Sequence, residues 1–162
     1  ARVRASGVSM SPDVRGRFDA SGRRVAVVAS RFNEVVTRRL VEGAVDALRQ
    51  HGVAPDAIDI YWVAGAFEVP QLAAKVARDG KADGVVWAGA IVRGETDHYD
   101  VLSRTVTQAI ESAALTTGVP MTLAVLTTDT LEQAVDRAGG KHGNAGWNAA
   151  VALVELMSQF RN

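Results

Sequence analysis

One histidine stands among three acidic residues in the segment VRGETDHYD. His98 is flanked by Asp97 and Asp100, and Glu95 comes three positions before it. These side chains could bind a divalent metal through carboxylate and imidazole ligands. They could also begin a helix, because Thr96 and the acids favour a helix N-terminus. A third reading is proton transfer by His98, since an imidazole titrates near neutral pH.

A metal site is the least favoured of these readings. The other histidines, His51 and His142, are expected at a helix end and in a different loop, so no second imidazole supports a ligand set. The turn instead offers the backbone N–H groups of Glu95 and Thr96 after Gly94, an arrangement that can bind phosphate. No Walker motif or G-x-G-x-x-G is present. We therefore expect a small phosphorylated metabolite rather than a nucleoside triphosphate or a dinucleotide.

Two phenylalanines and one arginine complete the set of residues that could bind a ligand. Phe32 and Phe67 lie in polar loops, where each could pack on the edge of a sheet or the two could bracket a planar ring. Arg137 follows a short helical stretch and could be solvated or could bind phosphate with its guanidinium fork. From the residues alone, the site would take a planar ligand and a phosphate, with a histidine between them.

Four apolar runs must position these residues, and each is followed by a polar or glycine-containing loop and an amphipathic stretch. The runs predict strands over residues 25–30, 58–63, 84–92 and 121–126, and a last helix is predicted over 145–160. Several runs are continuously apolar, which is typical of strands covered on both faces, and alternation with helices implies right-handed crossovers. We predict a three-layer α/β/α sandwich around a four-stranded parallel sheet, with ligands at the carboxyl ends of the strands.

The bulk composition excludes several classes of protein. Eighteen basic residues balance eighteen acidic ones, so nothing indicates a nucleic-acid partner, and the absence of cysteine excludes disulfides and thiolate sites. No apolar run reaches the roughly 18 residues that a membrane helix needs. We expect a flexible tail over residues 1–13, one domain over 14–162 and a cytoplasmic location.

Five motifs occur in a characteristic order along the chain. They are RFNE, GAFEVP, GAIVRGETDHYD, VLTTDTLEQAVDRAG and GNAGWNAA. Together they resemble lumazine synthase (6,7-dimethyl-8-ribityllumazine synthase) from about Val14 to Phe160. The resemblance implies a flavodoxin-like fold and a transferase of riboflavin biosynthesis, acting without metal or organic cofactor. Such an enzyme condenses 5-amino-6-(D-ribitylamino)uracil with L-3,4-dihydroxy-2-butanone 4-phosphate through an imine, loses phosphate and closes the second ring.

The resemblance also implies roles for individual residues. His98 would transfer protons, and Arg137 would be the counter-charge of a phosphate that Glu95 and Thr96 receive through backbone N–H groups and the threonine hydroxyl. Phe32 would stack on the pyrimidine ring. The other substrate-binding residues would hold the ribityl chain or line the ring pocket: Ala66, Phe67, Glu68, Ala90, Ile91, Val92 and Leu123.

Members of this family are oligomers, and the resemblance extends to their shared sites. Leu123 on the fourth strand and Arg137 would come from the neighbouring subunit. The protein is then expected to be a homopentamer or a sixty-subunit icosahedral capsid, and the short segment GGKHGNAG favours the capsid. The N-terminal segment could add a strand to a neighbouring subunit.

Two positions depart from the common family pattern. Leu123 stands where many relatives have an aromatic residue, and Ala145 stands where relatives commonly have the lysine of GNKG. Lys141 could compensate for that lysine if its loop folds inward. The departures leave an alternative open, namely a catalytically weakened shell-forming relative or one that only binds flavin or lumazine.

Overall fold

The predicted parallel sheet is present in the computed structural model, which describes residues 12–94 and 98–160. Its strands are β1 (Val25–Ser30), β2 (Ile58–Val63), β3 (Gly84–Val92) and β4 (Met121–Thr128). All neighbouring strands pair in parallel, in the order β2-β1-β3-β4. The four-stranded α/β fold that the sequence predicted is therefore confirmed.

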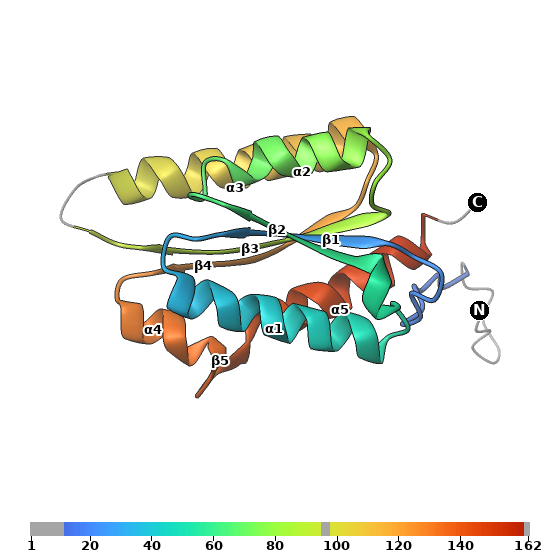
Figure 1. Ribbon diagram of the computed structural model, residues 1–162, viewed down its shortest axis with the longest axis horizontal. Helices are drawn as coiled ribbons and strands as arrows, with labels where there is room; N and C mark the ends of the chain where they lie inside the picture. Colours follow the sequence, from blue (N-terminus) through green and yellow to red (C-terminus); the bar gives the residue numbers. More distant parts are fainter. Residues whose placement is uncertain (1–11, 95–97, 161–162) are drawn as a thin grey trace.

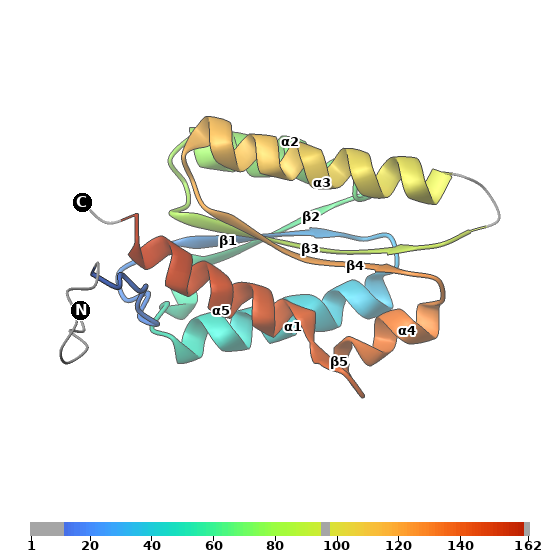
Figure 2. The ribbon, with the colours of Figure 1, turned by 180° about the vertical axis from the view of Figure 1, so that it is seen from behind.

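Helices cover both faces of the sheet (Figures 1 and 2). One layer holds α2 (Val69–Arg78) and α3 (His98–Thr117). The other layer holds α1 (Glu34–Gln50), α4 (Leu131–Asp136) and α5 (Ala145–Ser158). A 3-10 turn, η1 (Pro55–Ala57), precedes β2, and a small antiparallel hairpin of β5 (Ala138–Gly140) and β6 (Gly143–Asn144) joins α4 to α5. The sequence did not predict this hairpin.

Burial along the strands explains the continuous apolar runs. β1 is buried over its whole length and β3 up to its last residue, because both lie inside the sheet, whereas β2 at one edge is mostly half-buried. Alternate side chains enter two separate cores, one beneath α1 and α5 and one beneath α2 and α3. The second core contains Trp87, the largest fully buried side chain among the described residues.

Local signals fix where the helices begin. Thr130 and Gln133 form a capping box at the start of α4, with Thr130 as the N-terminal cap. The Asn144 side chain accepts from the backbone N–H groups of Gly146 and Trp147 at the start of α5. A Cβ on Gly146 would overlap the carbonyl oxygen of Leu40, so glycine allows α5 to pack tightly on α1.

The carboxyl edge of the sheet lies at the left of Figure 1, where α1, α3 and α4 begin. The described ends of the chain lie at the opposite edge. No helix within the described ranges has the length and apolarity needed to cross a membrane. Most of the predicted tail, residues 1–11, lies outside the described residues.

Candidate functional site

A cavity of about 350 Å³ opens at the carboxyl edge of the sheet. It brings together residues that the sequence singled out in two loops, at the end of β3 and at the start of α3: Phe32, Ala66, Ala90, Ile91, Val92 and His98. Gly65, Gly94, Tyr99 and Leu102 also line it and were not predicted. Tyr99 directly follows His98 in the motif, which is the signal that could have identified it. The volume is in the range of sites for small organic ligands.

Phe32 stands at this cavity because the backbone on both sides of it is fixed. The N–H groups of Arg31 and Phe32 donate to the carbonyl oxygens of Val63 and Ala64, over 2.8 and 3.1 Å. Asn33, in the left-handed conformation with φ of 59°, begins α1, and its side-chain amide donates to the carbonyl oxygen of Ala90 over 3.1 Å. Phe32 itself is 71% exposed. Its ring is therefore available to a planar ligand, and Asn33 is a positioning residue that the sequence reasoning missed.

The GAFE loop contributes differently from the prediction. Ala66 lines the cavity, but Phe67 and Glu68 do not. The Glu68 carboxylate accepts from the backbone N–H of Gly65 over 3.0 Å, and it thereby fixes the position of Gly65 in the wall of the cavity. Phe67 is 58% exposed. Within one chain, the structure brings neither side chain into the cavity.

His98 is the first residue of α3 and lies exposed at the cavity. Glu95 and Thr96, the predicted phosphate contacts, and Asp97 lie outside the described residues. Within residues 12–94 and 98–160, no three histidine or acidic side chains come together as metal ligands would.

Arg137 lies in a second cavity, of about 390 Å³, which β4, the β4–α4 connection and α4 line together. Val125, Thr127, Asp129 and Gln133 share this cavity with it. Arg137 is the C-terminal cap of α4, and its carbonyl oxygen accepts from the backbone N–H of Ala145 over 2.8 Å. His98 does not line this cavity, so one chain does not unite the predicted proton carrier with the predicted counter-charge.

Leu123 lines neither cavity. It lies on β4, the strand at the other edge of the sheet, and is 40% exposed. Lys141 is exposed in the turn between β5 and β6. Three predicted groups thus lie apart from the His98 cavity: Leu123, Lys141 and Arg137.

Arg93 connects the two cavities, although the sequence reasoning gave it no role. Its Nε donates to Asp129 over 2.9 Å, and its guanidinium carbon lies 4.4 Å from the ring centre of Tyr99. The hydrogen bond to Asp129, aided by the charge of Asp100, raises the pKa of Arg93 above its usual value. The guanidinium is therefore fully charged at any ordinary pH.

Comparison with known proteins agrees with the resemblance seen in the motifs. The family model for 6,7-dimethyl-8-ribityllumazine synthase matches residues 22–161. A protein of that name from Chlorobium phaeovibrioides is 47% identical over 148 residues, which are 91% of this chain and 96% of the relative. Another, from Chlorobium luteolum, is 46% identical over 149 residues, which are 92% of this chain and 96% of the relative.

Proposed function

The chain belongs to the 6,7-dimethyl-8-ribityllumazine synthase family, and from this premise we propose how its residues perform the reaction. The enzyme condenses the primary amine of 5-amino-6-(D-ribitylamino)uracil with the ketone of L-3,4-dihydroxy-2-butanone 4-phosphate. An imine forms with loss of water, and phosphate leaves by elimination, which turns the neighbouring hydroxyl-bearing carbon into a carbonyl. The ribityl-bearing nitrogen attacks this carbonyl and closes the second ring with loss of a second water. The observation that carries the proposal is the cavity in which Phe32 and His98 meet, within a chain that matches the family over nearly its whole length.

The pyrimidine ring binds in the His98 cavity. The exposed ring of Phe32 stacks on it, and the small side chains of Ala66 and Ala90 leave room for its flat face. Ile91 and Val92 close the apolar wall. Glu68 and Phe67 bind the ribityl chain at the outer rim, where Phe67 is exposed.

His98 transfers the protons that the reaction requires. The imidazole stands at the mouth of the cavity, on the first residue of a helix, where it can reach a carbonyl oxygen bound beside the ring. Imine formation needs a proton on the departing water, and ring closure needs one removed from nitrogen. An imidazole can do both, because its two ring nitrogens can donate and accept protons.

Phosphate is held by Glu95 and Thr96 from one subunit and by Arg137 from its neighbour. The separation of the His98 and Arg137 cavities within one chain supports a site shared between subunits. Leu123, exposed on the edge strand β4, would cover the ring from the same neighbour. Further exposed apolar side chains offer surface for such contacts: Val101, Leu115 and Leu131.

We infer a homopentameric ring and, beyond it, the icosahedral capsid. The connection from Arg137 to α5 supports this, because it is a compact hairpin that turns at Lys141 and His142 without a longer insert. Static light scattering measures the assembly directly. A monomer or dimer at micromolar concentration would contradict the shared site. A cytoplasmic location and one domain over residues 14–162 are parts of the same proposal.

The experiment that tests the activity mixes both substrates with the purified protein and follows the lumazine product by its absorbance. Because the condensation also proceeds slowly without enzyme, the rate is compared with a protein-free reaction. A rate at the spontaneous level would contradict the proposal. It would favour the alternative from the sequence analysis, a catalytically weakened shell-forming or ligand-binding relative. The similarity to named synthases over more than nine-tenths of the chain does not favour that alternative.

A further inference from the structure

Arg93 contacts two segments that carry different parts of the site. Its Nε donates to the Asp129 carboxylate over 2.9 Å, and its backbone N–H donates to the carbonyl oxygen of Thr128 over 2.8 Å, so it is tied to the β4–α4 connection. The same guanidinium lies 4.4 Å above the ring of Tyr99 and 3.7 Å from the Asp100 carboxylate. Tyr99 and Asp100 belong to the first turn of α3, directly after His98.

The β4–α4 connection is a firm anchor for this contact. Gln133 accepts from the backbone N–H groups of Asp129 and Thr130, over 3.0 and 3.2 Å. The Thr128 hydroxyl donates to the carbonyl oxygen of Thr130 over 2.8 Å. With its own backbone held in this way, Asp129 presents a fixed carboxylate to Arg93. The short helix α4 then leads directly to Arg137.

We propose that Arg93 is a positioning residue, which holds the first turn of α3, and with it His98, against the connection that leads to Arg137. The inference rests on the roles proposed above for His98 and Arg137. A planar guanidinium suits this task, because it can donate to a carboxylate and stack on an aromatic face at the same time. A lysine at this position would keep the positive charge, but its flexible ammonium group would not stack on the Tyr99 ring.

Arg93 also balances the charge of the two acids it contacts. Without it, Asp100 and Asp129 would be two uncompensated carboxylates beside a site that receives phosphate. Loss of Arg93 therefore acts in two ways: the misplaced histidine lowers kcat, and the exposed negative charge raises KM for the phosphorylated substrate.

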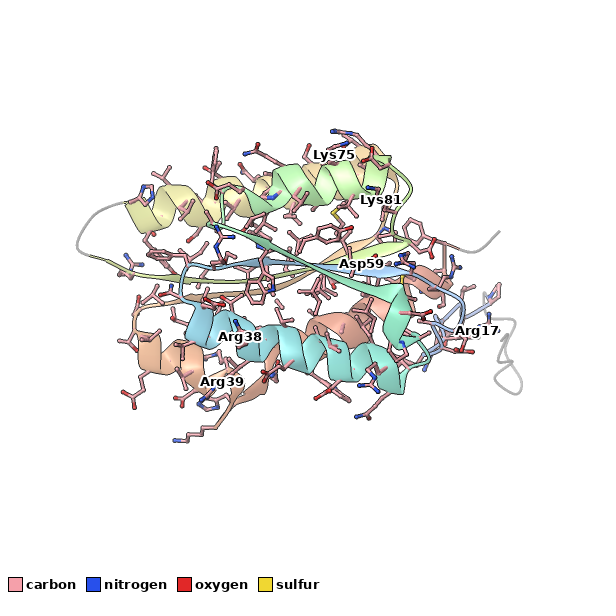
Figure 3. All side chains as sticks on the ribbon, viewed as in Figure 1. Arg17, Arg38, Arg39, Asp59, Lys75 and Lys81 are labelled. Atoms are coloured by element: carbon pink, nitrogen blue, oxygen red, sulfur yellow. The ribbon has the colours of Figure 1, made fainter. Side chains whose placement is uncertain are left out.

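The chain offers a matched control in Arg24. This side chain donates to Asp59 over 2.8 Å and is 48% exposed, as is Arg93. Arg24 precedes β1, and Asp59 lies near the amino end of β2, away from the carboxyl edge (Figure 3). Arg24→Met thus removes a similar ion pair outside the site.

The test compares steady-state kinetics of the wild-type protein with Arg93→Met, Arg93→Lys and Arg24→Met. We expect Arg93→Met to lower kcat by about tenfold or more, as displaced catalytic groups do, and to raise KM for the phosphorylated butanone. Arg93→Lys should have a wild-type KM for the phosphorylated butanone but a lowered kcat. Arg24→Met should match the wild type in both constants. A kcat for Arg93→Met within a factor of about two of the wild type, full rescue by lysine, or an equal loss in Arg24→Met would each overturn the proposal.

Amide hydrogen exchange gives a readout that does not depend on turnover. Peptides covering residues 98–107 should exchange faster in Arg93→Met than in the wild type, with no change in Arg24→Met. Unchanged protection of this turn would refute the positioning role, whatever the kinetics show. If the wild-type protein has no activity above the spontaneous rate, the proposed function fails, and the exchange measurement still decides whether Arg93 holds α3.

Discussion

The backbone N–H of Ala145 donates to the carbonyl oxygen of Arg137 over 2.8 Å. Residue 145 is the first residue of α5, and the motif resemblance implies a lysine, that of GNKG, at this position. This departure from the family pattern therefore lies directly beside the proposed counter-charge of the phosphate. Because the backbones of residues 145 and 137 are hydrogen-bonded, a long side chain at residue 145 would begin close to the Arg137 side chain.

Restoring a lysine at this position should tighten binding of the phosphorylated substrate. We expect Ala145→Lys to lower KM for the butanone phosphate by about fivefold, because an added exposed charge contributes up to about 1 kcal/mol, with kcat nearly unchanged. Ala152→Lys is the control, since it adds the same charge at an exposed position further along α5. An unchanged KM in Ala145→Lys would mean that the new ammonium does not reach the phosphate.

Removing the proposed proton carrier should slow the chemistry. We expect His98→Ala to lower kcat by about a hundredfold to a thousandfold, which is within the range for general acid–base groups, while KM changes little. His142→Ala removes an exposed histidine from the β5–β6 turn and should behave as the wild type. Equal kcat values in the two variants would contradict the role of His98.

Removing the counter-charge should weaken binding instead. We expect Arg137→Ala to raise KM for the phosphorylated butanone by about tenfold or more, because a charge-assisted contact to phosphate is lost. The KM for the ribitylaminouracil should stay near its wild-type value. A parallel loss for both substrates would indicate general damage to the pocket.

Mixed assemblies test whether the site is shared. At a butanone phosphate concentration well below KM, where both variants are slow, His98→Ala and Arg137→Ala subunits refolded together in equal amounts should show more activity than either variant alone. If each site takes one residue from each of two neighbours, about a quarter of the sites combine two intact residues, one half multiplied by one half. Activity at the level of the separate variants would place both residues in the same chain's site.

The close contact of α5 with α1 should make Gly146 intolerant of a side chain. A Cβ there would overlap the Leu40 carbonyl oxygen, so Gly146→Ala should destabilise the fold by about 1–3 kcal/mol. Scanning calorimetry should show a lower unfolding midpoint, by about 2–4 °C for each kcal/mol. Gly22→Ala is a useful comparison, since its Cβ meets nothing within 4 Å and only its φ of 79° is unfavourable. A midpoint for Gly146→Ala above that of Gly22→Ala would contradict the steric argument.

The strands and helices were predictable because their signals are local. The run at residues 25–30, which is apolar up to Ala29, proves to be buried on both faces. The hairpin after Arg137 was missed, because three- and two-residue strands leave no periodicity to detect. The order of the strands in the sheet could not be predicted from these local signals, since it depends on contacts between segments far apart in the sequence.

The site was predictable only in part. Residues that follow the ends of strands, such as Phe32 and His98, were placed at one edge because parallel strands share that edge. Asn33 and Arg93 were missed because their roles depend on partners 57 and 36 residues away, which no local pattern reveals. The motif resemblance, rather than physical reasoning on a single chain, indicated that Arg137 would serve a neighbouring subunit.

The arrangement of the sheet also separates the two poles of the molecule. His98 and the cavity that it lines lie where the strands end, while the described ends of the chain lie where the strands begin (Figure 1). Within one chain, the segments near residues 12 and 160 are therefore separated from the His98 cavity by the length of the sheet.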